Sequence, residues 1–343
     1  MVRRDLVVVG ASAGGIDALM RIVSGLPPDF PAAMLIVVHQ SAARRSALPD
    51  ILRRIGDLPA KQAEDGDNVQ PGQLLVAAPD RHLIVHDGRV TLSRGPRENG
   101  HRPAVDVLFR SAARSLGPRV VGLVLSGALD DGAAGLVAVT QRGGVGVVQD
   151  PDDSVQPGMP NAAIEAVTSS RVLPTREIAP ALLELVREQL SDDVAGSAAE
   201  VTPLMSMEVA MADMDPNQVH ELDPPGEPAG LSCPDCQGTL FRITEGDLTR
   251  FRCRVGHAWS PESLVAQQTV AVETALWMGL RSLEEKAALS QNMSKRAAEK
   301  GHNHVAASFE ERADEAQNAS ELLRQLIAHA GEVPPPVEQA AGR

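Results

Sequence analysis

Residues 1–190 repeat one pattern, in which a short, continuous apolar run is followed by a stretch with helical spacing. Runs without polar interruption are typical of strands buried on both faces, and the helical stretches supply the long connections that parallel strands need. Strands are therefore expected at 5–10, 33–39, 73–79, 120–127 and 144–150. The pattern predicts an α/β fold, with a doubly wound, mostly parallel sheet covered by helices.

One insert departs from this pattern. The segment HLIVHDGRVTLS, residues 82–93, places Asp-Gly between two runs of alternating apolar residues. This arrangement is typical of a β-hairpin with a two-residue turn. We therefore expect a hairpin inserted into the parallel domain.

The composition changes after residue 190. Residues 191–231 contain nine Asp or Glu and no Lys or Arg, which predicts an acidic and largely disordered linker. Within it, MSMEVAMADM has a helix-forming composition, and its docking on a neighbouring element stays open. A Cys/His unit is then expected at 232–259, a helical hairpin at 260–330 interrupted by KGHNH, and a tail at 331–343.

Charge and composition exclude several classes of function. The net charge of −13 disfavours a nucleic-acid partner, and a chain that is 2% aromatic with no Tyr lacks the residues on which single-stranded bases stack. No apolar run approaches the roughly 20 residues of a membrane-spanning helix, and no secretory signal is visible. We therefore expect a cytoplasmic protein without membrane insertion.

The turn after the first predicted strand carries a candidate nucleophile. Residues 10–15, Gly-Ala-Ser-Ala-Gly-Gly, satisfy G-x-S-x-G between a strand and a helix, which presents the Ser12 hydroxyl at the end of the strand. The amides of Ala13 and Gly14, at the start of the helix, are candidates to stabilise an oxyanion. A dinucleotide-binding loop fits poorly, because Ser12 stands where G-x-G-x-x-G requires its second glycine. An anion-binding turn without chemistry remains an alternative.

Two further strand ends supply the partners that a nucleophilic serine needs. His39 ends the second predicted strand, at the same edge of the sheet as Ser12, whereas His82, His86 and His101 lie in or near the hairpin insert. Asp130 and Asp131 follow the strand at 120–127, and either can orient an imidazole or merely cap the next helix. The sequence thus predicts a Ser, His, Asp triad in an order unlike that of α/β-hydrolases.

Six motifs make a family resemblance specific. They are GASAGG, VVHQ, AEDGDNVQPGQLLVAAPDRHL, HRPAVDVLF, LSGALDDGAAG and QPGMPNAAI. In order and spacing, residues 5–190 resemble the catalytic domain of chemotaxis protein-glutamate methylesterases, the CheB family. Such enzymes hydrolyse glutamate methyl esters on the cytoplasmic helices of chemoreceptors, releasing methanol, and many also deamidate receptor glutamines.

The resemblance assigns roles to individual residues. It implies Ser12 as nucleophile, His39 as base and Asp131 as orienting acid, with no cofactor for catalysis. Arg102, in the segment His-Arg-Pro, is a weaker candidate for contacting substrate.

The chain also departs from the family pattern. Ala13 and Ala128 stand where Thr and Met are common. Family members usually carry an amino-terminal receiver domain whose phosphorylation relieves inhibition, and here Met1 almost abuts the first strand, so we expect no regulation by that route. Alternatives are therefore an esterase for another substrate, or a non-catalytic regulatory scaffold on the same fold.

All three cysteines of the chain fall in one short segment, with a histidine beside them. CPDC, sixteen residues and CRVGH give Cys233, Cys236, Cys253 and His257, whose spacing predicts a closed, structural zinc site. A redox C-x-x-C pair is the competing interpretation, but no thioredoxin-like context surrounds it.

This zinc unit and the helical hairpin resemble the carboxyl-terminal extensions of some methylesterase-like proteins. An added interaction or oligomerisation module is one interpretation. Packing of the helices on the chain's own domain is equally compatible with the sequence.

Overall fold

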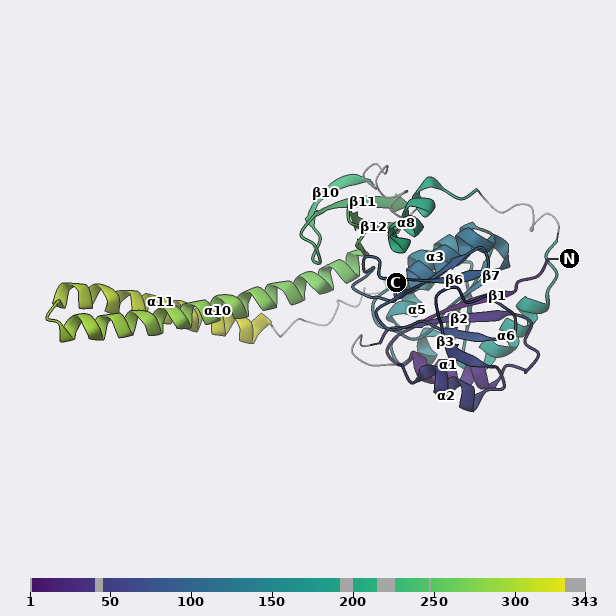
Figure 1. Ribbon diagram of the computed structural model, residues 1–343, viewed down its shortest axis with the longest axis horizontal. Helices are drawn as coiled ribbons and strands as arrows, with labels where there is room; N and C mark the ends of the chain where they lie inside the picture. The colour runs from purple at the N-terminus through teal and green to yellow at the C-terminus, as the bar shows by residue number, and fades with distance from the viewer. Residues whose placement is uncertain (1, 41–45, 192–199, 215–225, 247, 331–343) are drawn as a thin grey trace, which may run out of the picture. The chain divides into compact units, whose positions relative to one another are not determined.

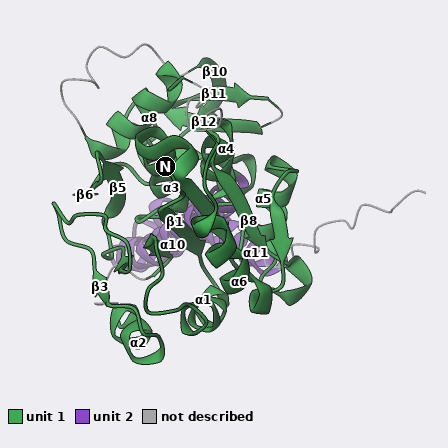
Figure 2. Ribbon diagram, turned by 90° about the vertical axis from the view of Figure 1, so that its right-hand side faces the viewer, with its two compact units in different colours: residues 1–264 green, residues 265–343 purple. Residues whose placement is uncertain are grey.

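The computed structural model (Figure 1) describes residues 2–40, 46–191, 200–214, 226–246 and 248–330. The chain forms two compact units, residues 1–264 and residues 265–343 (Figure 2). The predicted catalytic domain and the predicted Cys/His unit therefore belong to the same compact unit.

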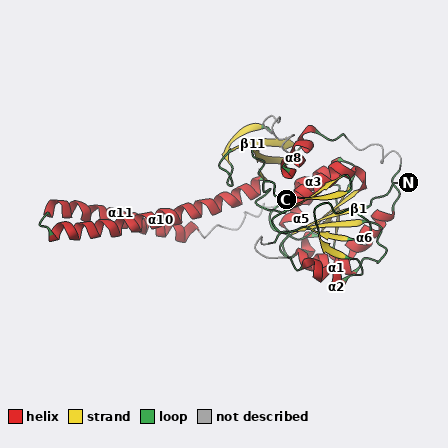
Figure 3. Ribbon diagram, viewed as in Figure 1, coloured by secondary structure: helices red, strands yellow, loops and turns green. Residues whose placement is uncertain are grey.

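A seven-stranded sheet forms the centre of the first unit (Figure 3), and each of its strand pairs is parallel. In chain order its strands are β1 (Leu6–Ala11), β2 (Ala33–Val38), β3 (Ala60–Gln62), β4 (Leu74–Val76), β7 (Val120–Val124), β8 (Val145–Gln149) and β9 (Arg171–Leu173). The order across the sheet is β3-β4-β2-β1-β7-β8-β9. The five predicted strands are confirmed. The two missed strands, β3 and β9, lie at the two edges of the sheet and are mostly exposed, so they carry no continuous apolar run.

Helices cover both faces of this sheet, as the long connections of parallel strands require. One face carries α1 (Gly15–Ser24), α2 (Leu48–Ile55) and α6 (Thr175–Arg187); the other carries α3 (Val105–Leu116), α4 (Ala133–Gln141) and α5 (Gly158–Ala166). Two short 3-10 helices, Gly117–Arg119 and Pro151–Asp153, complete the connections. Alternate residues of β1 point into the two cores, which explains its uninterrupted apolar run: Val7 and Val9 join one and Leu6 and Val8 the other.

The predicted hairpin insert is confirmed. Strands β5 (His82–His86) and β6 (Arg89–Ser93) pair antiparallel, with His86 opposite Arg89 across the Asp-Gly turn. Leu83, Val85 and Val90 join the core on the α3 side of the sheet. The hairpin thus extends that core beyond the parallel sheet.

The expectation of a largely disordered linker is wrong for residues 203–213. There the chain forms helix α8 (Pro203–Asp213), capped by Thr202, whose hydroxyl accepts a hydrogen bond from the Met205 amide. The helix is buried on nearly all sides and includes the carboxylate of Glu208, which is 1% exposed. Acidic composition predicted solvation, but three arginines surround this carboxylate and make its burial tolerable. The rest of the predicted linker is described only in part, since 192–199 and 215–225 lie outside the described residues.

The Cys/His unit is a four-stranded sheet in the order β10-β11-β12-β13. Its strands are β10 (Glu227–Ser232), β11 (Thr239–Glu245), β12 (Leu248–Cys253) and β13 (Ala258–Trp259), paired antiparallel. A small apolar core around Leu240, Trp259 and Leu264 holds it together. Strands β11 and β12 form an antiparallel hairpin between the two pairs of candidate ligands.

Two long helices follow. They are α10 (Pro261–Glu299) and α11 (Asn303–Ala330), and the predicted interruption lies at Gly301, with φ at +73°. The helices run antiparallel, since Arg324 of α11 pairs with Glu284 of α10. No helix among the described residues is long and apolar enough to cross a membrane.

Candidate active site and candidate metal centre

Three adjacent strands bring the predicted triad together. Ser12 follows β1, His39 follows β2 and Asp131 lies in the loop after β7, and β1 lies between β2 and β7 in the sheet. The chain leaves β1 toward β2 on one side and later returns to β7 on the other. This reversal of strand order is where open α/β sheets bind ligands, outside the carboxyl ends of the strands.

The hydroxyl of Ser12 lies 3.2 Å from Nδ1 of His39. Backbone hydrogen bonds fix both residues: the Ser12 amide donates to the Ser126 carbonyl at 3.0 Å, and the His39 amide donates to the Ala11 carbonyl at 3.1 Å. The serine is half-buried. It is therefore held rigidly at the sheet edge while its hydroxyl stays within reach of the imidazole.

The other ring nitrogen of His39 bonds the carboxylate. Nε2 lies 2.7 Å from Oδ2 of Asp131, and the two side chains are only 7% and 2% exposed. With Nε2 donating its proton to Asp131, Nδ1 is left as the acceptor for the Ser12 hydroxyl. The imidazole thus uses its two nitrogens in the opposite sense to the serine protease template, where Nε2 faces the serine.

The Asp131 carboxylate is held in its ionised form. Burial raises its pKa, but the hydrogen bond and charge of His39 and a hydrogen bond from the Val105 amide outweigh burial, and the net pKa is lowered. The amide of Asp106 also donates to it, at 3.1 Å. A buried carboxylate with this many donors stays anionic and can steady an imidazolium.

Small residues shape the turn that carries Ser12. Gly14, the residue before α1, has φ at +77°, a conformation that favours glycine, and a Cβ there would lie 2.4 Å from Cβ of Val155. Ala13 and Gly14 form the turn at the positive end of α1. Their amides stay the predicted oxyanion donors.

Arg102 lies in a different setting from the triad. Its guanidinium donates to Asp80 at 2.9 and 2.6 Å and to the carbonyls of Arg94 and Gly95. These bonds brace the loop that leads into α3. The substrate-contacting role expected for Arg102 stays a prediction, and none of these contacts supports it.

Three side chains at the site escaped the sequence reasoning. His101, which the sequence analysis placed in or near the hairpin insert and gave no role, stacks on His39 with ring centroids 3.6 Å apart. Asn99 donates to Asp131 at 3.3 Å, and Asp106 accepts from the amides of Gly132 and Gly135 at the start of α4. The dipeptide Asn99-Gly100 was the available signal, because Asn-Gly is a strong marker of a tight turn.

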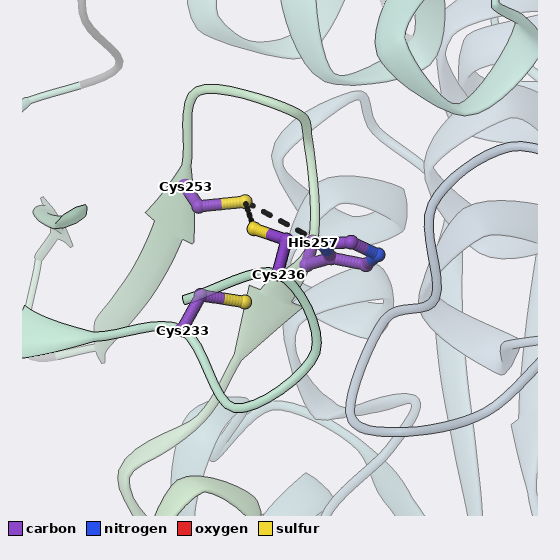
Figure 4. Close-up of side chains that lie close together, drawn as sticks. All are labelled: Cys233, Cys236, Cys253 and His257. Atoms are coloured by element: carbon purple, nitrogen blue, oxygen red, sulfur yellow. Dashed lines mark hydrogen bonds between the residues drawn. The ribbon is translucent and has the colours of Figure 1, made fainter. Parts of the chain in front are cut away.

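The four predicted metal ligands converge at a second place in the first unit (Figure 4). Their ligand atoms all lie within 4.8 Å of one another. Sγ of Cys236 and Sγ of Cys253 are 3.6 Å apart, and Sγ of Cys253 is 3.6 Å from Nδ1 of His257. In a tetrahedral zinc site, bonds of about 2.3 Å to sulfur and 2.0 Å to nitrogen place ligand atoms about 3.5 to 3.8 Å apart.

The surroundings of the cluster also suit a cation. The hydrogen bond between Cys253 and Cys233 lowers the pKa of the Cys233 thiol to about 3 and, together with burial, raises the pKa of the Cys253 thiol, so Cys233 is the thiol of this pair that ionises first. Nε2 of His257 lies 3.7 Å from the Asp235 carboxylate, and a carboxylate behind a ligating imidazole is a common second partner in zinc sites. The donor set therefore fits zinc.

A hydroxyl, an imidazole and a carboxylate bonded in series at the edge of a parallel sheet are the arrangement used by serine hydrolases. The family model described as CheB methylesterase matches residues 7–182, and this chain belongs to that family.

Individual relatives agree with this placement. The chain is 41% identical to "Protein-glutamate methylesterase/protein-glutamine glutaminase 2" of Anaeromyxobacter dehalogenans, over 54% of each chain. It is 39% identical to "Protein-glutamate methylesterase/protein-glutamine glutaminase 1" of Xanthomonas campestris, over 52% of this chain and 51% of that protein. The chain thus spans about half the length of the curated relatives it matches.

A solved structure matches the same part of the chain. The crystal structure of the Thermotoga maritima CheB methylesterase catalytic domain is 34% identical, with a TM-score of 0.52, and the match covers 54% of this chain and 100% of that one. The remainder of this chain, which includes the Cys/His unit and the long helices, lies outside the family match.

Proposed function

We propose that this protein is a serine esterase that removes methyl groups from glutamate side chains of chemoreceptors, and that it also deamidates receptor glutamines. The observation that carries the proposal is the bonded series from Ser12 through His39 to Asp131. The names of the relatives at about 40% identity support the substrate class.

The reaction begins with a proton transfer. Nδ1 of His39 takes the proton of the Ser12 hydroxyl as its oxygen attacks the ester carbonyl carbon. The imidazolium that forms is steadied by Asp131, which lies 2.7 Å from Nε2. The carbonyl oxygen becomes an oxyanion, for which the amides of Ala13 and Gly14 are the proposed donors.

Three further proton transfers complete the cycle. His39 returns the proton to the departing methoxide, so that methanol leaves and an acyl-enzyme remains on Ser12. His39 then takes a proton from water as the water attacks the acyl carbon, and the serine leaves with that proton. A receptor glutamine follows the same steps and releases ammonia instead of methanol.

Release of methanol from methylated receptor membranes tests this function. Wild-type protein is expected to release methanol, and Ser12→Ala to release none while keeping its circular dichroism spectrum. Ser24→Ala is the matched control, because Ser24 is an exposed serine of α1 whose hydroxyl donates to the nearby Arg21 carbonyl. Equal methanol release by Ser12→Ala and wild type would refute the mechanism.

The same assay separates the alternatives. Release of methanol from a different ester, but not from receptor, would identify an esterase for another substrate. A wild-type protein that turns over neither would favour the non-catalytic scaffold.

We also propose that Cys233, Cys236, Cys253 and His257 bind one structural zinc ion. Four protein ligands leave no vacancy for water, so the ion would link the two knuckles and stabilise the fold of the unit. Purified protein is expected to contain about one equivalent of zinc, and Cys233→Ser and Cys253→Ser to lose it. Metal-free protein with a fully folded Cys/His unit would contradict this proposal.

The proposed partners follow from the substrate. The esterase would act on methylated cytoplasmic helices of chemoreceptors and therefore in the cytoplasm, without inserting into the membrane. Exposed apolar side chains on α10 and α11, among them Trp277, Met278, Leu322 and Leu326, support self-association through these helices. Sedimentation of the full chain over a range of concentrations tests for such oligomers.

A further inference from the structure

One short loop contacts two members of the triad. Hydrogen bonds between the backbones of Glu98 and His101, at 2.8 and 3.2 Å, close a turn whose central residues, Asn99 and Gly100, both have positive φ. From this turn the Asn99 amide donates to the Asp131 carboxylate, and the His101 ring stacks on His39. The position of the loop therefore affects both the acid and the base of the proposed triad.

The Cys/His unit holds the other side of the same loop. The Asn99 backbone amide donates to the carbonyl of Ala258 at 2.8 Å, and the Ala258 amide donates to the carbonyl of Arg97 at 3.3 Å. The side-chain oxygen of Asn99 accepts from the Ser260 amide and the Ser263 hydroxyl, both at 3.0 Å. Because Ala258 directly follows the metal-ligand candidate His257, only a few bonds separate the ligand cluster from Asp131.

A cluster of buried ion pairs fixes the position of this loop relative to α3, α8 and β12. Glu98 accepts from Arg110 of α3 at 3.1 and 3.2 Å and from Arg252 of β12 at 2.8 Å. Arg252 also bonds Glu208 of α8 at 2.9 Å, and it precedes the ligand candidate Cys253. Displacing either carboxylate would leave the buried arginines short of one negative charge, so the cluster opposes movement of the loop relative to the Cys/His unit.

We propose that Asn99 is a positioning residue through which the Cys/His unit keeps Asp131 and His39 in their catalytic arrangement. Losing the metal, or the bonds from Ser260 and Ser263, would loosen the loop and slow the chemical step without weakening substrate binding. The inference rests on the proposed esterase function for its kinetic readout. Its spectroscopic readouts do not depend on that function.

The first experiment removes, in separate variants, the hydrogen bonds made by the side chains of Asn99 and Ser263. Asn99→Ala is expected to lower kcat about tenfold and Ser263→Ala about threefold, with KM unchanged in both. Ser263→Ala leaves the contact of Asn99 with Asp131 intact, so it tests only the hydrogen bond from the Cys/His unit. It also keeps the proposal testable if Asn99→Ala fails to fold. The matched control is Ser320→Ala. Ser320 is a buried serine of α11 whose hydroxyl donates to the nearby Gln317 carbonyl, and the variant should match wild type.

A spectroscopic signal accompanies the kinetics. The His39 proton that bonds Asp131 should give a downfield NMR resonance, which Ser12→Ala retains and Asn99→Ala and Ser263→Ala broaden or shift. Kinetics and resonance of Ser263→Ala equal to those of wild type would overturn the inference and leave the esterase function standing. A wild type without esterase activity would instead refute the proposed function, and the resonance would still decide the inference.

The second experiment removes the metal. Trp259 is 1% exposed, belongs to the core of the Cys/His unit and lies 3.7 Å from the place a Cβ on Gly100 would occupy, so its fluorescence reports on this contact. Trp277→Phe leaves Trp259 as the only tryptophan of the chain. Chelation of zinc should shift the Trp259 emission to the red and lower kcat at least threefold, and added zinc should restore both. Full activity in Cys233→Ser protein shown to lack metal would overturn the inference.

Discussion

The imidazole ring of His101 lies stacked on that of His39, with centroids 3.6 Å apart and planes inclined by 12°. Burial, together with the positive charge that His39 can carry, lowers the pKa of His101 to about 4. His101 is therefore neutral near pH 7. It therefore presents a flat, uncharged ring against which the His39 imidazole packs.

Replacing His101 tests this role. His101→Ala is expected to lower kcat about three- to tenfold, because the stacking contact is lost and the His39 ring gains freedom. His101→Phe keeps a flat ring and should stay within about twofold of wild type. Methanol release at pH 7 measures both. A His101→Phe variant as impaired as His101→Ala would show that a ring nitrogen of His101, rather than its stacking, matters.

Glu208 anchors α8 among three arginines, and its removal should destabilise the first unit. Its carboxylate bonds Arg110 at 3.0 Å, Arg250 at 2.6 Å and Arg252 at 2.9 Å. Glu208→Gln leaves these buried cations short of one negative charge, and breaking such a cluster costs about 3 to 5 kcal/mol. Urea unfolding followed by circular dichroism measures the loss. The control Glu177→Gln, at an exposed pair with Arg176, should change stability by less than about 0.5 kcal/mol.

Asp130 should make stability depend on pH. Burial raises its pKa to about 7, with added repulsion from Glu262 and Asp131, against a hydrogen bond from Ser260. Its normal pKa is about 4, so the folded state binds more protons than the unfolded state between about pH 4 and pH 7. The contribution of Asp130 to the free energy of unfolding is thus fully present below about pH 4 and is lost as the pH rises toward 7.

Comparison of Asp130→Asn with wild type isolates this contribution. At pH 8 the variant is expected to be more stable, by on the order of 1 to 3 kcal/mol, and near pH 4 the difference should vanish. Urea unfolding at several pH values measures it. A difference that stays constant with pH would contradict the raised pKa of Asp130.

Gly127 packs against Ser12, the proposed nucleophile, so a methyl group at position 127 should impair catalysis. A Cβ on Gly127 would lie 2.8 Å from Cβ of Ser12 and 2.0 Å from Sδ of Met159. The methionine side chain can move, whereas Ser12 is held by its backbone hydrogen bond to Ser126. Gly127→Ala is expected to lower kcat by more than about tenfold, since a small misplacement of a reacting group is costly.

A matched glycine provides the control for steric crowding. Gly279 lies within α10, and a Cβ there would meet only the Leu323 side chain at 3.4 Å. Gly279→Ala should leave kcat unchanged and stabilise the helix by about 0.5 to 1 kcal/mol. Equal activity of Gly127→Ala and wild type would show that the Ser12 loop tolerates displacement.

The parallel sheet could be predicted because its strands are buried on both faces. Strands buried on both faces have uninterrupted apolar sequences. The carboxyl ends of neighbouring parallel strands also lie at the same edge of the sheet. Placing Ser12, His39 and Asp131 at that edge therefore required only the strand boundaries. Edge strands β3 and β9 were not predicted because they are mostly exposed and therefore lack a continuous apolar run.

The burial of helix α8 and the contacts of the loop at 98–101 could not be predicted from the sequence. An acidic segment is predicted to be exposed to solvent unless its cationic partners are known. The arginines that pair with Glu208 lie 42 to 98 positions away along the chain. The same holds for Asn99, which reaches Asp131 on one side and Ser263, 164 positions along, on the other. Such pairings leave no local periodic signature.

By itself the sequence determined the five inner strands of the parallel sheet, the hairpin, the metal-ligand spacing and the three strand-end groups of the proposed triad, because each follows from local periodicity or from the geometry of a parallel sheet. Only the tertiary structure decided that His101 stacks on His39, that α8 is buried and that the Cys/His unit bonds the loop behind Asp131. The physical reason is that these contacts join distant segments through individual polar and aromatic side chains, whose pairing is fixed by packing rather than by sequence spacing.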